Sequence, residues 1–105
     1  MKHYNKLVRD GIPAAIEAEG RRCSAVVMDE AEYVEALLQK LVEEAREVAA
    51  ASEEERAAEL ADLYEVVDAL LAHHGWQEAT IRALQARRRA ERGGFSKRLK
   101  LVWAD

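Results

Sequence analysis

The sequence predicts a mainly α-helical protein, a bundle of three long helices preceded by a short N-terminal helix, with a small two-stranded β element as a further expectation. Three observations support this class. Apolar residues recur three and four positions apart over long stretches, capping residues stand where those stretches begin, and glycines stand where they end. The 105 residues suffice for one modest core, so we expect a single domain spanning residues 1–105.

The first expected element is a short helix near the N-terminus. Gly11 and Ile12 begin it, and Pro13 stands at an early position, where its missing N–H is harmless. Gly20 is expected to end this helix. The segment therefore predicts about two helical turns before the chain becomes extended.

An extended segment is expected after this helix. Residues 22–28 are rich in small and β-branched apolar side chains and suit a strand, and residues 99–103 are its expected partner. Cys23 falls within the first of these segments, and we expect it to be buried as a small hydrophobic residue.

Capping residues define the first two long helices. Asp29 and Ser52 are each followed three residues later by glutamate, a pattern in which the first side chain accepts a hydrogen bond from a backbone N–H of the first helical turn. We therefore expect helices at residues 30–51 and 53–73. Gly75 is expected to end the second helix in a left-handed conformation.

A third long helix is expected to begin at Trp76 or Gln77 and to reach Arg92, where Gly93 and Gly94 break it. Trp76 is interpreted as a core anchor, in preference to a platform for stacking a nucleobase.

The composition indicates a small cytoplasmic protein. The net charge is -4, with 16 basic and 20 acidic residues interspersed, so we expect no stable binding of nucleic acid and no membrane surface. No apolar run has the length of a signal or membrane segment, and the single cysteine excludes an intrachain disulfide. A free nucleotide fits this charge balance better than a polymer.

Five carboxylates fall in two short clusters, one in each of the first two long helices: Glu43, Glu44 and Glu47, then Glu59 and Asp62. Residues three or four apart project from the same side of a helix. If the two helices pack antiparallel, these side chains converge into the oxygen-rich arrangement that holds Mg²⁺ or Mn²⁺ beside a phosphate.

The helical wheel separates these carboxylates by their expected burial. Glu59 lies inside the apolar stripe of its helix and Asp62 lies at the edge, where a carboxylate is costly unless a partner meets it. Glu44 borders the stripe of the first long helix, Glu47 lies farther round, and Glu43 is farthest. The alternative is an ordinary solvated face supported by ion pairs one turn apart.

The acidic strings also carry a resemblance. Residues 43–47, EEARE, and residues 59–62, ELAD, are separated by eleven residues and resemble the EExxE…ExxD signature of the MazG-like all-α nucleoside triphosphate pyrophosphohydrolases. Residues 4–13, YNKLVRDGIP, and residues 91–95, ERGGF, resemble segments of the same group, in particular its phosphoribosyl-ATP pyrophosphohydrolase-like members. The resemblance spans nearly the whole chain.

The resemblance implies a metal-dependent enzyme that hydrolyses a nucleoside triphosphate to the monophosphate and pyrophosphate, in the cleaning of nucleotide pools. It implies that Glu44, Glu47, Glu59 and Asp62 bind Mg²⁺, with Mn²⁺ as a substitute, and that Glu43 positions water. It also implies a homodimer or homotetramer, which fits three long amphipathic helices in so short a chain.

Four basic residues are candidates for binding substrate phosphates. Lys6 and Arg9 lie in the N-terminal segment that resembles the family, and their alternative role is in surface ion pairs. Arg92 and Lys97 flank the glycine pair and Phe95. That segment is either a phosphate-binding loop or a helix stop with Phe95 packed into the core.

Three other interpretations remain open at this stage. The substrate could be phosphoribosyl-ATP, which would place the protein in histidine biosynthesis. The chain could instead be a helical module that binds nucleotide or a partner without catalysis. The third alternative is a plain structural helical oligomer, which would show no stabilisation by metal ions.

Overall fold

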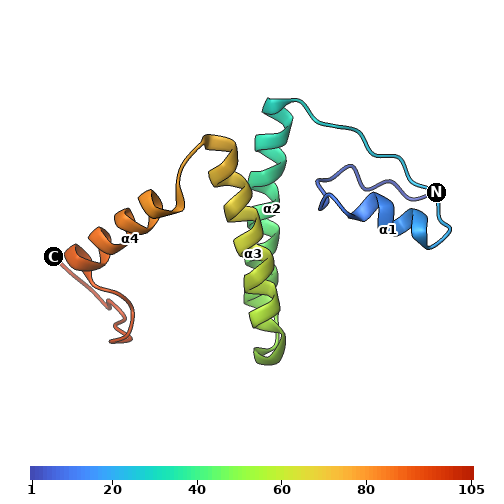
Figure 1. Cartoon of the computed structure of the whole chain (residues 1–105). Helices are drawn as coiled ribbons and strands as arrows, with labels where there is room; N and C mark the ends of the chain where they lie inside the picture. The colour runs from blue at the N-terminus through green and yellow to red at the C-terminus, as the bar shows by residue number, and fades with distance from the viewer.

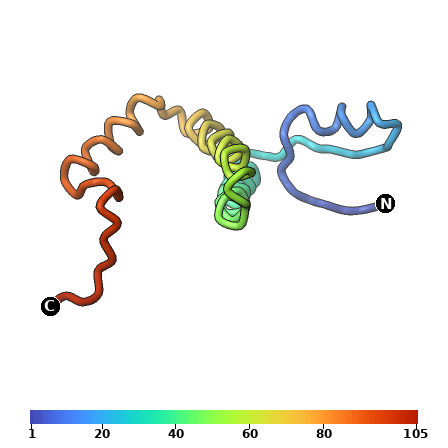
Figure 2. Tube along the Cα trace, turned by 90° about the horizontal axis from the view of Figure 1, so that it is seen from below, coloured from blue at the N-terminus to red at the C-terminus, as the bar shows by residue number.

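A computed structural model describes residues 1–105 and shows an all-helical protein without strands. Its helices are α1 (Ile12–Ala18), α2 (Glu30–Ala50), α3 (Glu53–His74) and α4 (Glu78–Arg92). The mainly α class, with a short helix before three long ones, is confirmed. The helices α2 and α3 form a central antiparallel hairpin, with α1 on one side of it and α4 on the other (Figures 1 and 2).

The predicted caps determine where the central helices begin and end. The side chain of Asp29 accepts a hydrogen bond from the N–H of Glu32 at 2.8 Å, and Ser52 accepts one from the N–H of Glu55 at 3.3 Å. Gly75 ends α3 with a φ of 69°, a left-handed conformation that favours glycine. All three caps agree with the sequence prediction, because capping depends on neighbouring residues alone.

The turn between α2 and α3 is short and held by one arginine. Ala51 and Ser52 are both extended, so the chain reverses direction within two residues. The guanidinium of Arg56 donates hydrogen bonds to the carbonyls of Val48 at 3.1 Å and Ala51 at 2.6 Å. These bonds satisfy carbonyls that the end of α2 leaves without helical partners.

The core of the chain is the α2–α3 seam, by which we mean the contact between these two helices. Leu37 is 2% exposed and Val66 is 7% exposed, and no other apolar residue is fully buried. No other two helices make an extensive contact. Near the open end of the hairpin, the rings of Tyr33 and His73 meet edge to face, with their centroids 5.7 Å apart. The seam therefore supplies most of the packing energy available within one chain.

The rest of the chain is unusually exposed. Its accessible surface is 9641 Å², whereas a compact protein of 11.8 kDa exposes about 5,900 Å². The radius of gyration is 18.3 Å, whereas about 13 Å is typical of a compact domain of this length. None of the four helices combines the length and the apolar character that crossing a bilayer requires.

Two predictions about the terminal segments are wrong. Residues 22–28 and 99–103 do not pair as strands, because the first lies beside α1 and the second beyond α4, on opposite sides of the hairpin (Figure 1). An extended segment needs a second extended segment beside it to pair its backbone hydrogen bonds, and neither of these segments has one. Cys23 is consequently exposed, and its sulfur lies 3.7 Å from the carbonyl oxygen of Pro13.

Two aromatic residues also depart from their expected positions. Trp76 is 54% exposed and stacks on His74 with the ring centroids 4.3 Å apart, so it does not anchor a core within this chain. Gly93 ends α4 with a φ of 83°, as expected of a helix stop, but Phe95 is 98% exposed. No other segment packs over Trp76 or Phe95, because α4 projects away from the hairpin (Figure 1).

Replacing Leu37 with alanine is expected to lower the free energy of unfolding by about 2–5 kcal/mol, because the change leaves a cavity in the seam. Glu35→Ala, at an exposed position of the same helix, is the matched control, with an expected change of less than about 0.5 kcal/mol. Urea unfolding followed by circular dichroism, at one protein concentration, measures both. Equal midpoints for the two variants would contradict this placement of the core.

Candidate functional site

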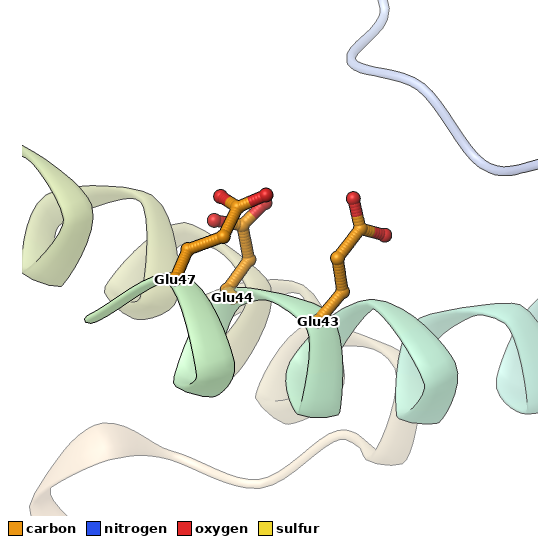
Figure 3. A group of neighbouring side chains, drawn as sticks. All are labelled: Glu43, Glu44 and Glu47. Carbon is orange, nitrogen blue, oxygen red and sulfur yellow. The ribbon is translucent and has the colours of Figure 1, made fainter. Parts of the chain in front are cut away.

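The hairpin brings the five predicted carboxylates into one acidic cluster: Glu43, Glu44, Glu47, Glu59 and Asp62. The cluster consists of two overlapping groups. Ligand atoms of Glu43, Glu44 and Glu47 lie within 4.8 Å of one another, and so do those of Glu44, Glu59 and Asp62. Figure 3 shows the three α2 carboxylates projecting from the same side of the helix. Glu44 belongs to both groups and therefore links the two helices.

The short turn explains why the carboxylates meet. Glu44 stands seven residues before Ala51, and Glu59 stands seven residues after Ser52. In an antiparallel hairpin these two positions lie at the same height, about 10 Å from the turn at 1.5 Å per residue. Glu47 lies three residues after Glu44, and Asp62 lies three residues after Glu59. Both therefore project from the same side of their helix as those residues and belong to the cluster.

Two oxygens of the cluster are buried without a hydrogen-bond partner. Glu44 is only 7% exposed, and its Oε2 atom has no donor nearby. The Oε2 atom of Glu59 is likewise buried and has no hydrogen-bond partner. A buried carboxylate oxygen without a partner is costly, because it has lost its hydration and gained nothing in exchange. These two oxygens therefore favour a cation or a hydrogen-bond donor that the single chain does not supply.

Three cations lie against other oxygens of the cluster. Lys40, one turn before Glu44, places its ammonium 3.5 Å from Glu44 Oε1 and 3.9 Å from Glu43 Oε1. The ammonium of Lys6 donates to Glu43 Oε1 at 3.1 Å. Arg9 donates to Asp62 Oδ1 at 2.7 Å. Five carboxylates thus face three positive charges.

The environment moves the pKa values of two glutamates in opposite directions. Burial, together with the negative charge of neighbouring Glu47, raises the pKa of Glu44 above its ordinary value of 4.5, and Lys40 does not cancel this effect. The hydrogen bond from Lys6, aided by the charge of Lys40, lowers the pKa of Glu43. Glu43 is thus held ionised, whereas Glu44 binds a proton more readily than an exposed glutamate does.

The four predicted phosphate-binding residues fall into two sets. Lys6 and Arg9 reach the acidic cluster. Arg92 and Lys97 are exposed at the end of α4 and just beyond it, and neither makes an ion pair with the cluster. Within one chain the structure brings only the N-terminal pair to the carboxylates.

The partners of Lys6 and Arg9 are not evident from the sequence. These cations lie 37 and 53 residues before the carboxylates that they contact. Helical periodicity relates residues within one element and carries no information about such distant pairs. The only available signal is that both cations lie on one short segment, three residues apart.

A shallow hollow, open to solvent, lies beside the cluster on one face of α2, and side chains of this helix alone form it. Its lining residues are Gln39, Val42, Glu43, Arg46 and Glu47. A ligand in this hollow would contact two of the cluster carboxylates and one arginine.

Glu44→Gln is expected to raise the melting temperature of the metal-free protein at about pH 7. A pKa raised by folding means that the stability supplied by the protonated carboxyl is complete below 4.5 and is lost as the pH rises through the raised value. Glutamine mimics the protonated form at every pH, so the advantage of the variant should vanish in acid.

Thermal melts in chelator between about pH 4 and pH 8 measure this difference. Glu35→Gln, at an exposed position of α2, is the control and should follow the wild type at every pH. If Glu44→Gln instead destabilised the protein at neutral pH, the ionised carboxylate would have to be favourably paired.

Comparison with known proteins does not place the chain in a family. No family model matches it, and neither the curated proteins nor the solved structures include a match. A functional proposal for this chain therefore depends on the geometry of the acidic cluster and on the motifs of the sequence.

Proposed function

We propose that this protein is a metal-dependent hydrolase that splits a nucleoside triphosphate into the monophosphate and pyrophosphate. One observation carries the proposal: the buried Oε2 atoms of Glu44 and Glu59 have no partner within a cluster of five carboxylates drawn from two helices. The resemblance of the acidic strings and of both terminal segments to MazG-like pyrophosphohydrolases supports the same activity.

The donor set fits Mg²⁺, with Mn²⁺ as a substitute. Both ions prefer oxygen ligands, and carboxylates are their usual ligands in proteins that handle phosphates. Glu44, Glu47, Glu59 and Asp62 would hold the ion. When bound there, Mg²⁺ would supply Lewis-acid chemistry, making water more acidic and neutralising charge on the leaving pyrophosphate.

The protein residues have separate roles in this proposal. Glu44 is buried and fixed by Lys40, so it provides a rigid ligand at the centre of the cluster. Glu43 is held ionised by Lys6, which makes it a weak base. It is therefore suited to orienting a water molecule through a hydrogen bond and poorly suited to removing its proton.

The charges at the cluster favour a phosphate-bearing substrate. A triphosphate brings about four negative charges, which one Mg²⁺ leaves partly uncompensated. Lys6 and Arg9 stand at the rim of the cluster, about half exposed, and can meet the remaining phosphate oxygens. We place this activity in the cytoplasm, where free nucleoside triphosphates are present.

Assembly into a homodimer or homotetramer is part of the proposal. The chain exposes about 3,700 Å² more than a compact protein of its mass, whereas a standard interface removes only about 800 Å² from each partner. Large apolar side chains such as Leu84, Leu101 and Trp103 contribute to this surface. An extensive interface, or more than one, is needed to cover it.

Glu59→Gln is expected to reduce Mg²⁺-dependent pyrophosphate release by about 100-fold or more, because it removes one buried ligand while keeping its shape. The assay uses Mg²⁺ or Mn²⁺ and a panel of canonical, deoxy and modified nucleoside triphosphates together with phosphoribosyl-ATP. The compound that gives the highest kcat/KM identifies the class of substrate.

Glu65→Gln is the matched control, because Glu65 lies on α3 but is exposed and outside the cluster. It should retain activity close to that of the wild type, and chelator should abolish activity in both proteins. Wild-type turnover in Glu59→Gln, or no turnover by folded wild-type protein across the panel, would refute the proposed chemistry.

Light scattering of the purified protein is expected to give at least twice the chain mass of 11.8 kDa. The physical reason is the exposed apolar surface, which a single chain cannot cover by itself. A species of one chain mass that keeps its helical content at micromolar concentration would exclude the assembly.

A further inference from the structure

The N-terminal arm, residues 1–11, is joined to the hairpin by few polar contacts. No backbone hydrogen bond links the arm to α2 or α3. The only side-chain hydrogen bonds between them are those of Lys6 with Glu43 and Arg9 with Asp62. Asn5 has a φ of 48°, a left-handed conformation that asparagine tolerates, and it turns the chain just before Lys6.

Each of these contacts involves one of the two groups of the cluster. Lys6 binds Glu43, which belongs to the group on α2, and Arg9 binds Asp62, which belongs to the group shared by α2 and α3. The arm therefore places one cation on each candidate ion site. Lys40 differs from them, because it lies on α2 itself and stays beside the cluster wherever the arm goes.

A divalent cation at the cluster would compete with the arm. An ion bound to Asp62 would lie within about 5 Å of the Arg9 guanidinium, a distance at which like charges repel. Lys6 and Arg9 together supply two positive charges, the same number as one Mg²⁺. Exchange of the arm for the ion therefore leaves the net charge of the cluster unchanged.

We propose that the N-terminal arm is a latch that a divalent cation opens: the ion binds Asp62 beside Glu44 and Glu59, its charge displaces Arg9 and with it the arm, and Lys6 and Arg9 are freed to meet the triphosphate. This inference rests on the proposed metal site. In this proposal Lys6 and Arg9 first contact carboxylates of the cluster and then, after the ion has bound, contact phosphate oxygens. The arm thereby couples occupancy of the ion site to substrate binding.

Limited digestion with trypsin tests the latch without any activity measurement. Trypsin cleaves after Lys6 only when that side chain leaves Glu43 and enters the pocket of the protease. Arg21 provides a reference within the same digest, because it pairs only with exposed Glu19, at 2.9 Å, away from the cluster. The ratio of cleavage after Lys6 to cleavage after Arg21 cancels any effect of the metal on trypsin itself.

Saturating Mn²⁺ is expected to raise this ratio about two- to fivefold, the range that the loss of exposed ion pairs supports. Glu43→Gln should show the raised ratio without metal, because the partner of Lys6 is neutral in that variant. Glu35→Gln, which is exposed on the same helix, should behave as the wild type. Glu59→Gln should not respond to Mn²⁺.

Binding of Mn²⁺ is followed separately through the loss of its free-ion signal in electron paramagnetic resonance. If the folded wild type binds Mn²⁺ and the ratio stays constant or falls, the latch is overturned and the proposed metal site stands. If the folded protein does not bind Mn²⁺, the proposed function and the latch both fail. Binding with a raised ratio supports the latch.

Discussion

The packing of α2 against α3 is the interaction on which the rest of this structure depends, and it buries charge together with apolar surface. Leu37 and Val66 provide the apolar part of the contact, and Glu44 lies buried between the same two helices. Ionised carboxylates weaken a seam of this kind unless cations compensate them. Stability of the hairpin and chemistry of the cluster are therefore coupled, because both involve the same few turns of helix.

The cations around the cluster differ in how firmly they are held. Lys40 belongs to the same helix as its partners, and its position follows from helical geometry. Lys6 and Arg9 belong to a segment that contributes little to the core, so their contacts are reversible without unfolding the hairpin. Lys40 is thus a permanent counter-charge of the cluster, and Lys6 and Arg9 are the ones that can leave it, a division that suits the proposed binding of an ion and a phosphate.

The sequence predicts those features that depend on neighbouring residues and fails where distant segments must meet. The caps at Asp29, Ser52 and Gly75 follow from local chemistry, and so does the convergence of two carboxylate strings across a two-residue turn. The prediction that Cys23 and Trp76 are buried is wrong, because burial requires other segments to cover these side chains and the chain brings none near them. Pairing of the N-terminal cations with the cluster could not be predicted, since no periodic pattern relates a coil to a helix many residues away.

The two-residue turn has a consequence for the order of events in folding. All five carboxylates fall within residues 43–62, so closing one short hairpin brings them together. Contacts so near in the sequence form quickly, because little chain entropy is lost in closing the loop between them. The cluster is therefore complete while the terminal segments are still unplaced. An ion captured at that stage would favour the closed hairpin by mass action and would act as a template for the later steps of assembly.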